Sequence, residues 1–160
     1  MLKSFLETDF YLLEKWVQTP EILFEFAGTT FTFPLTYLQI VNYQLQFPDR
    51  LLYLGYTPEG RAFAFGEIIP QCTNIPRLGR ILVGEQSDRG KGLGKYFIKL
   101  LISECTRRFL TAKVELYVME ENKIAQQTYK SLGFEFSTDD PILLHHQEKV
   151  YKIFKMKRST

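Results

Sequence analysis

The chain has 160 residues, of which 45% are hydrophobic and 24% charged, the balance of a folded soluble protein rather than a disordered one. A formal net charge of +2 is too small to indicate a nucleic-acid-binding protein, and no apolar run reaches the roughly 18 residues of a membrane-spanning helix. The N-terminal segment lacks the basic start and apolar run of a secretion signal. We therefore expect one domain over residues 1–160, with neither nucleic acid nor membrane as a partner.

The N-terminal half predicts helices followed by a β-hairpin. Helices are expected from apolar spacing and capping residues over residues 10–17, 20–26 and 35–46. Two β-rich segments follow, over residues 51–56 and 62–69. Pro58-Glu59-Gly60 supplies the turn between them, and Gly66 inside the second segment suggests a bulge.

The C-terminal half alternates between strands and helices. Strands are expected over residues 77–83, 113–118, 134–137 and 150–157. Helices are expected over residues 92–109 and 122–132. The polar segment 138–149, which contains Pro141 and the pair His145-His146, is expected to be a loop.

A glycine-rich loop, Arg89-Gly90-Lys91-Gly92-Leu93-Gly94, lies between an apolar strand and a long amphipathic helix. Glycines at alternate positions let the backbone turn sharply and approach a ligand closely. Backbone N–H groups at the start of a helix point outward together with the positive end of the helix dipole. This arrangement suits a pyrophosphate, to which Arg89 and Lys91 would add charge-assisted contacts.

Two other classes of glycine loop do not fit this segment. A Walker loop ends in Gly-Lys-Ser or Gly-Lys-Thr, but Lys91 is followed by Gly92. A dinucleotide-binding fold needs Gly-x-Gly-x-x-Gly in an early βαβ unit, whereas these glycines follow Gly-x-Gly-x-Gly late in the chain. The alternative to a phosphate-binding role is that the glycines only permit a tight strand-to-helix turn.

Residues 78–134 resemble the GCN5-related N-acetyltransferase (GNAT) family in the order of their elements and in two motifs. The loop from Arg89 to Gly94 matches the family pattern Arg/Gln-x-x-Gly-x-Gly/Ala, and Glu121 to Phe134 matches its Asn-bearing helix. The opening of the chain more loosely resembles the ribosomal-protein N-terminal acetyltransferase branch. The resemblance implies an α/β (α+β) GNAT fold, whose mixed and mostly antiparallel sheet of about six to seven strands has helices on both faces and splayed parallel central strands.

The resemblance also implies acetyl-CoA as a co-substrate. Its pantetheine arm would enter where strands 78–83 and 113–118 part, like an added strand. Backbone groups of three residues would meet the pantetheine amides, namely Leu82, Val83 and Gly84. The pyrophosphate would lie on Arg89, Gly90, Lys91, Gly92, Leu93 and Gly94.

Two side chains of the last helix are candidates for contact with the reacting end. Asn122 and Tyr129 are two helical turns apart and would share one face. By resemblance, Asn122 contacts the pantetheine, and the Tyr129 hydroxyl protonates the departing thiolate, for which a pKa near 10 is suitable. The alternative is that Tyr129 is a core aromatic residue.

The general base is harder to predict. An ammonium has no lone pair, so the acceptor must lose a proton before it attacks the thioester. Glu67 is our first candidate, acting directly or through water, although a strand glutamate is more often solvated or paired. Tyr117 stands where some protein N-terminal acetyltransferases carry a Glu, which leaves the base open.

Histidine and cysteine usage indicates neither a metal nor a covalent mechanism. His145 and His146 would face opposite ways, and no third ligand is evident. Cys105 lies inside an amphipathic helix, where a buried core residue is expected, and it forms no CxxC motif with Cys72. We expect a reduced, cytoplasmic chain without metal.

The combined prediction is an N-acetyltransferase that moves an acetyl group directly from acetyl-CoA to a primary amine. The acceptor would be a small molecule or a protein N-terminus, bound by residues from segments 20–46 and 138–149. A non-catalytic acyl-CoA sensor and a purely structural domain of the same fold are the alternatives. A homodimer stays open, since the family often dimerises.

Overall fold

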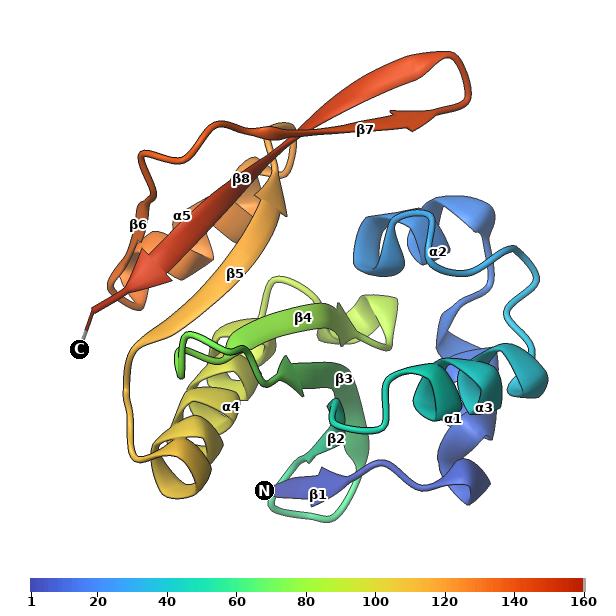
Figure 1. The fold of residues 1–160 in the computed structure, drawn as a ribbon. Helices are drawn as coiled ribbons and strands as arrows, with labels where there is room; N and C mark the ends of the chain where they lie inside the picture. Colours follow the sequence, from blue (N-terminus) through green and yellow to red (C-terminus); the bar gives the residue numbers. More distant parts are fainter. Residues whose placement is uncertain (160) are drawn as a thin grey trace.

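The computed structural model describes residues 1–159 and shows one open sheet with helices on both of its faces (Figure 1). Within these residues the sheet has eight strands: β1 (Leu2–Ser4), β2 (Leu51–Tyr56), β3 (Ala62–Ile69), β4 (Arg77–Val83), β5 (Val114–Met119), β6 (Phe134–Phe136), β7 (Ile142–His146) and β8 (Lys149–Arg158). Their order is β1-β2-β3-β4-β5-β8-β6, and β7 also pairs with β8. All pairs are antiparallel except β4 with β5.

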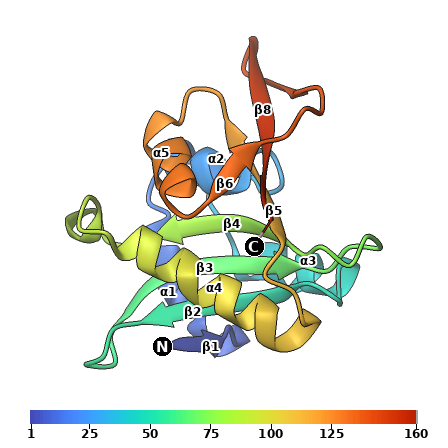
Figure 2. The ribbon, with the colours of Figure 1, turned by 90° about the vertical axis from the view of Figure 1, so that its left-hand side faces the viewer.

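The helices divide between the two faces of the sheet (Figure 2). One face carries α1 (Phe10–Trp16), α2 (Pro20–Ala27) and α3 (Tyr37–Gln46). The other carries α4 (Leu93–Phe109) and α5 (Lys123–Ser131). Two single 3-10 turns complete the chain, η1 (Glu7–Asp9) and η2 (Gln86–Asp88). Among the described helices, none is long and apolar enough to span a bilayer.

Threonine hydroxyls start the two longer N-terminal helices. Thr19 accepts a hydrogen bond from the Ile22 amide at 3.2 Å and precedes Pro20, which occupies the first turn of α2. Thr36 accepts one from the Gln39 amide at 3.4 Å at the start of α3. Each hydroxyl satisfies an amide that the helix itself leaves without a partner.

Two buried clusters hold the layers together, one on each face of the sheet. Leu13, Trp16 and Ile40 pack with Phe65 under α1 to α3. Under α4 and α5, the second cluster is centred on fully buried side chains, among them Phe97, Leu101, Leu116, Phe134 and Met156. The central strands β2, β3 and β4 are thus covered on both faces, whereas β7 and much of β8 are exposed.

The expected fold class is confirmed, and the observed sheet is larger than expected. Predicted helices and strands agree with the observed ones to within two residues at their ends. The prediction that segment 138–149 is a loop is wrong, because Ile142–His146 forms β7. Its hairpin turns at Gln147 and Glu148, with φ values of 48° and 63°. Gly, Asn or Asp usually occupies such positions, so the sequence lacks the turn signal. The short strand β1 was also not predicted.

The register between β3 and β4 shifts where Gly66 suggested a bulge. Phe65 pairs with Leu82 but Glu67 pairs with Gly79, so the extra residue lies in β4 rather than in β3. Arg80 takes up the bulge with a left-handed φ of 46°. Glycine is favoured at position 66 for a different reason, because a Cβ there would lie 2.8 Å from the Phe97 ring of α4.

Candidate active site

The parallel strands β4 and β5 separate soon after they begin. They pair only through Arg77 with Glu115 and Leu78 with Leu116, and Figure 1 shows them diverging beyond this point. Within residues 1–159, the β5-facing edge of β4 has no strand partner from Gly79 to Val83. Free backbone groups on such an edge can bind an extended ligand as an added strand.

Leu82, Val83 and Gly84, the residues predicted to meet pantetheine, lie at the end of this edge. Leu82 and Val83 pair with β3 on their other side. The Gly84 amide already donates to the Phe63 carbonyl at 2.9 Å, so Gly84 has only its carbonyl to offer. Their contact with pantetheine stays a prediction.

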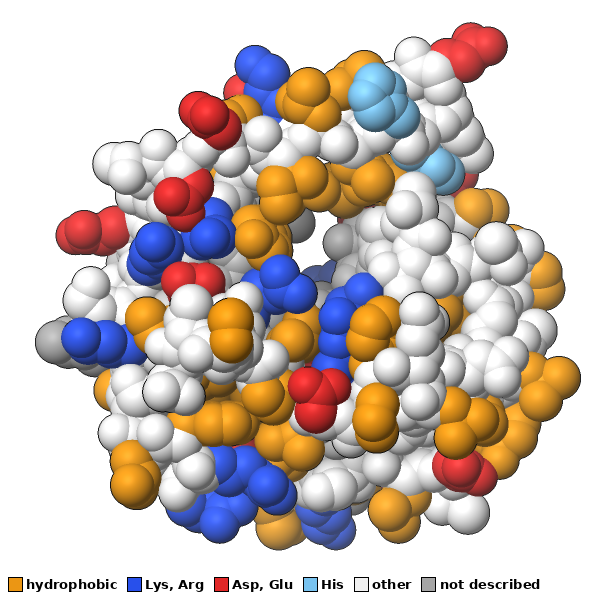
Figure 3. Space-filling view, in the orientation of Figure 1, with side chains coloured by type: hydrophobic (Ala, Val, Ile, Leu, Met, Phe, Trp, Pro, Cys, Tyr) orange, Lys and Arg blue, Asp and Glu red, His pale blue; other side chains and the backbone are white. Residues whose placement is uncertain are grey.

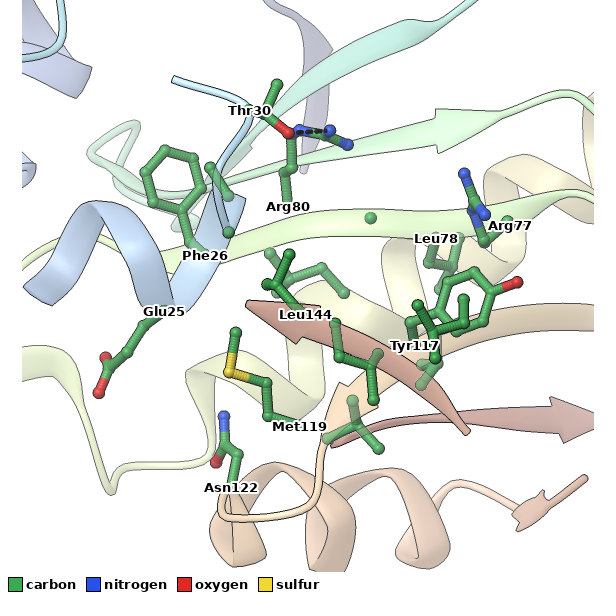
Figure 4. Close-up of a pocket in the computed structure, with 18 of the residues that line it drawn as sticks. Glu25, Phe26, Thr30, Arg77, Leu78, Arg80, Tyr117, Met119, Asn122 and Leu144 are labelled. Carbon is green, nitrogen blue, oxygen red and sulfur yellow. Dashed lines mark hydrogen bonds between the residues drawn. The ribbon is translucent and has the colours of Figure 1, made fainter. Parts of the chain in front are cut away.

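A cleft of about 400 Å³ occupies the space where β4 and β5 part. Figure 3 shows a hollow there, bordered by hydrophobic side chains and by Lys and Arg side chains. The close-up in Figure 4 shows side chains reaching the cleft from the diverging strands, from α2 and from β7. Its polar and aromatic lining includes Glu25, Arg77, Arg80, Tyr117, Asn122 and Tyr129.

The glycine loop has the backbone shape expected of an anion-binding loop. Gly90 and Gly92 have φ values of 74° and 79°, and Gly92 is the N-cap of α4. A Cβ at either glycine would meet nothing within 4 Å. Glycine is therefore favoured by the left-handed backbone, and the space beside the loop is open.

Exposed cations flank this loop, and its base is fixed to the rest of the chain. Arg89 and Lys91 are exposed and make no ion pair within residues 1–159. Asp88 accepts two hydrogen bonds from Arg61, at 2.6 and 3.0 Å. This bidentate contact lowers the Asp88 pKa below its usual value. The loop is thereby anchored while its two free cations face solvent.

Gly84 anchors the loop from the other side. A Cβ at this glycine would lie 2.2 Å from the Trp16 ring, so the indole of α1 packs directly on the backbone. Beside it, Lys15 forms an ion pair of 2.6 Å with Glu85. Helix α1 thus supports the segment that leads from β4 to the glycine loop.

Asn122 and Tyr129, which their spacing placed on one face of the last helix, both line the cleft. Asn122 also has a structural task, because its Oδ1 accepts the Ala125 amide at 3.1 Å as the N-cap of α5. Tyr129 is 9% exposed, and its ring packs on Phe134 with 5.9 Å between centroids. Burial raises the Tyr129 pKa to about 12. The ring is therefore both a core residue and part of the cleft wall, and the two catalytic roles stay predictions.

Glu67 lies behind the cleft wall rather than on it. The side chain is fully buried, forms an ion pair with Arg80, and accepts the Tyr43 hydroxyl at 2.7 Å. Arg80 also donates to Thr30 Oγ1 at 2.7 Å (Figure 4), and Arg50 donates to Tyr43. Burial is the main cause that raises the Tyr43 pKa to about 12. Arg80, not Glu67, faces the cleft, and the base role of Glu67 stays a prediction.

His146 and Cys105 lie in ordinary packing environments, and His145 is exposed. His146 stacks on Phe24, with 4.2 Å between ring centroids and 11° between planes. In residues 1–159, no three His, Cys, Asp or Glu side chains are grouped to hold a metal ion. Cys105 is fully buried, and burial raises its thiol pKa to about 12, which disfavours a nucleophilic thiolate.

Several cleft residues carry no local sequence signal. Arg77, Glu25 and Met119 belong to β4, α2 and β5, and no motif links them. They line one cleft because the sheet order places β5 beside β4 and because α2 packs against β4. Tyr117 was noticed in the sequence only as a departure from a family pattern.

Solved structures with little sequence identity share this fold. A spermidine N-acetyltransferase from Vibrio cholerae, in complex with CoA and spermine, superposes with a TM-score of 0.81 at 12% identity, covering 98% of this chain and 93% of that one. A ribosomal-protein-alanine N-acetyltransferase from Brucella melitensis gives a TM-score of 0.76 at 14% identity, covering 100% and 99%. At such identities the likeness shows the fold alone.

Sequence comparison gives the family. A UPF0039 protein of Schizosaccharomyces pombe is 26% identical over 80 residues, which are 50% of this chain and 51% of that protein. The chain thus matches about half the length of this curated relative. The model of the Acetyltransferase (GNAT) family matches residues 15–134, which include the glycine loop, the diverging strands and α5. The chain belongs to the GNAT acetyltransferase family.

Proposed function

We propose that the protein transfers an acetyl group from acetyl-CoA directly to a primary amine. The observation that carries this proposal is the free edge of β4, which runs beside the cleft and leads to the open glycine loop. A cleft, an edge and an anion site in this order match the thioester, the amides and the pyrophosphate of one extended molecule. The CoA bound to the similar Vibrio cholerae enzyme supports the same cofactor here.

The glycine loop would hold the pyrophosphate mainly through backbone amides. The N-terminus of α4 contributes the positive end of a 17-residue helix. Arg89 and Lys91 would add charge, since neither is engaged with a carboxylate in the described part of the chain. The anchoring of Asp88 by Arg61 would keep that carboxylate away from the phosphates.

In the transfer step, the amine nitrogen attacks the thioester carbonyl carbon, the C–S bond breaks, and CoA leaves as a thiolate. Tyr129 stays protonated at neutral pH because its pKa is about 12. An alkyl thiol has a pKa near 8.5, so a full proton transfer from this phenol to the thiolate is uphill. The raised pKa therefore favours a hydrogen bond from Tyr129 that stabilises the thiolate, after which solvent supplies the proton.

The amine must also lose a proton. Glu67 keeps its predicted role only as a base acting through water, since Arg80 and Tyr43 occupy its two oxygens. The geometry favours a second role, in which Glu67 holds Arg80 on the cleft wall at the β4 bulge.

The test is a calorimetric titration with acetyl-CoA, followed by a free-thiol assay over a panel of amines. We expect saturable binding and thiol release that depends on the amine. Binding without release under any amine would support the alternative of a non-catalytic acyl-CoA sensor. Absence of binding would overturn the proposal.

A further inference from the structure

One end of the cleft is basic. Arg77 of β4 lines the cleft, and its guanidinium carbon lies 4.9 Å from the centroid of the Tyr117 ring of β5. Figure 4 shows the two side chains next to each other. The Lys155 ammonium lies 5.8 Å from the same ring. The aromatic face thus holds the Arg77 guanidinium at the cleft through a cation–π contact.

The charge of Arg77 is not matched by an ion pair. Within residues 1–159, its guanidinium makes neither a hydrogen bond nor a salt bridge, whereas Lys155 is paired with Asp139 at 3.0 Å. Glu115 lies across from Arg77 in the β4–β5 register, but it is buried and accepts a hydrogen bond from Gln71 at 3.3 Å without an ion pair to Arg77. Arg77 therefore keeps its five donors for another group.

Arg80 presents a second unsatisfied donor at the same wall. One of its nitrogens pairs with the Glu67 carboxylate, which balances its charge, and another donates to the Thr30 hydroxyl. Its Nε, however, is buried and has no hydrogen-bond partner within the described residues. A buried donor without an acceptor is costly, and a ligand oxygen in the cleft would relieve that cost.

The opposite end of the cleft is acidic. Figure 4 places Glu25 of α2 at the far side from Arg77, with Met119 and Leu144 between them. The Glu25 carboxylate makes no ion pair in residues 1–159. An elongated acceptor would thus meet a cation at one end, an anion at the other and apolar surface along its middle.

We infer that the acceptor of this acetyltransferase carries an anionic group, such as a carboxylate, which binds Arg77 while its amine is acetylated. The inference rests on the proposed function. A guanidinium fork matches a carboxylate with two parallel hydrogen bonds. A polyamine would instead bring a second cation toward Arg77, which costs Coulomb energy in a half-buried cleft. Amino-acid-like acceptors are therefore favoured over polyamines.

The test compares amines of matched length and similar basicity that end in a carboxylate, a methyl group or a second amine, together with α-amino acids. Initial rates of thiol release give kcat/KM for each acceptor. The carboxylated members should exceed their matched amines by about tenfold or more, the usual scale of a charge-assisted contact. Arg77→Gln should remove this preference mainly by raising KM, and Arg77→Lys should restore part of it.

Arg107→Gln is the matched control, since Arg107 is exposed on α4 away from the cleft, and it should leave the preference unchanged. A preference that survives in Arg77→Gln overturns the inference, as does faster transfer to diamines or equal use of all three classes. Titration with acetyl-CoA separates a failure of the acceptor assignment from a failure of the proposed function. Intact binding with one of these outcomes contradicts only the acceptor assignment, whereas absent binding contradicts the proposed function itself.

Discussion

The glycine loop and the cleft between β4 and β5 are built in different ways. The loop is one continuous segment, and its shape depends on backbone conformation at Gly90 and Gly92. The cleft takes its walls from α2, two diverging strands and the β7–β8 hairpin, which are far apart in the chain. A cofactor common to a family can thus be bound through local backbone geometry. The shape and charge of the cleft depend on which distant side chains the topology brings together.

The largest effect is expected for Glu67→Gln, which tests whether the cleft wall depends on the charges buried behind it. Glu67→Gln leaves Arg80 without its counter-charge in a buried site. We expect the free energy of unfolding to fall by about 3 kcal/mol in urea titrations. The exposed pair of Glu121 with Lys149 is the control, and Glu121→Gln should cost less than about 1 kcal/mol. Similar small losses for both variants would contradict a structural role for Glu67.

Gly92→Asp tests the loop by itself. A side chain at a φ of 79° is strained, and a carboxylate there would repel phosphate. In calorimetry, acetyl-CoA should bind about 100-fold more weakly, because backbone strain and charge repulsion both oppose binding. Gly60 has a φ of 88° with equally open surroundings, at the β2–β3 turn. Gly60→Asp should therefore bind acetyl-CoA normally, and equal weakening in both variants would show that the effect is not local.

Tyr129→Phe separates catalysis from binding. Loss of the hydrogen bond from the hydroxyl to the thiolate should lower kcat by about 10- to 100-fold and leave acetyl-CoA affinity nearly unchanged. Tyr53→Phe is the matched control, because the pKa of Tyr53 is also about 12 but its hydroxyl donates to Glu104 outside the cleft. Full turnover by Tyr129→Phe at saturating substrates would exclude the hydroxyl from the transfer step.

The pKa of Tyr129 also predicts the alkaline side of the pH profile. A phenol with a pKa of about 12 stays protonated below that pH. Transfer should therefore rise as the acceptor amine loses its proton and should show no fall due to Tyr129 up to about pH 10. A falling limb near neutrality that disappears in Tyr129→Phe would contradict the raised pKa.

Asn122→Ala should have the smallest effect. Loss of the cap that accepts the Ala125 amide should cost about 1 kcal/mol of unfolding free energy. If Asn122 also contacts pantetheine, acetyl-CoA affinity should fall as well. Thr19→Ala removes a comparable cap from α2 and should cost similar stability with unchanged acetyl-CoA binding. Equal binding by both variants would leave Asn122 a capping residue only.

Features that depend on local sequence patterns could be predicted from the sequence. Periodic apolar residues and capping signals located the central helices and strands, and the glycine spacing located the loop. The strand β7 was missed because its turn uses Gln147 and Glu148 in left-handed conformations. The position of the β4 bulge was only half predicted, since Gly66 marks the site while Arg80 adopts the unusual backbone.

Side-chain partners were the least predictable part of the candidate site. Glu67 looks like an available carboxylate in the sequence, and only the fold shows it enclosed by Arg80 and Tyr43. Arg77 has no motif of its own, and its contact with Tyr117 exists because β5 begins parallel to β4. Such contacts depend on register and topology rather than on spacing along the chain.

Hydrogen exchange with and without acetyl-CoA tests the central claim most directly. If acetyl-CoA lies along the free edge of β4 and on the glycine loop, backbone amides in residues 79–94 should become protected, together with the Asn122 end of α5. Amides of the distant β1–β2 edge should exchange unchanged. Protection confined to other segments, or none in 79–94 at saturating acetyl-CoA, would contradict the account.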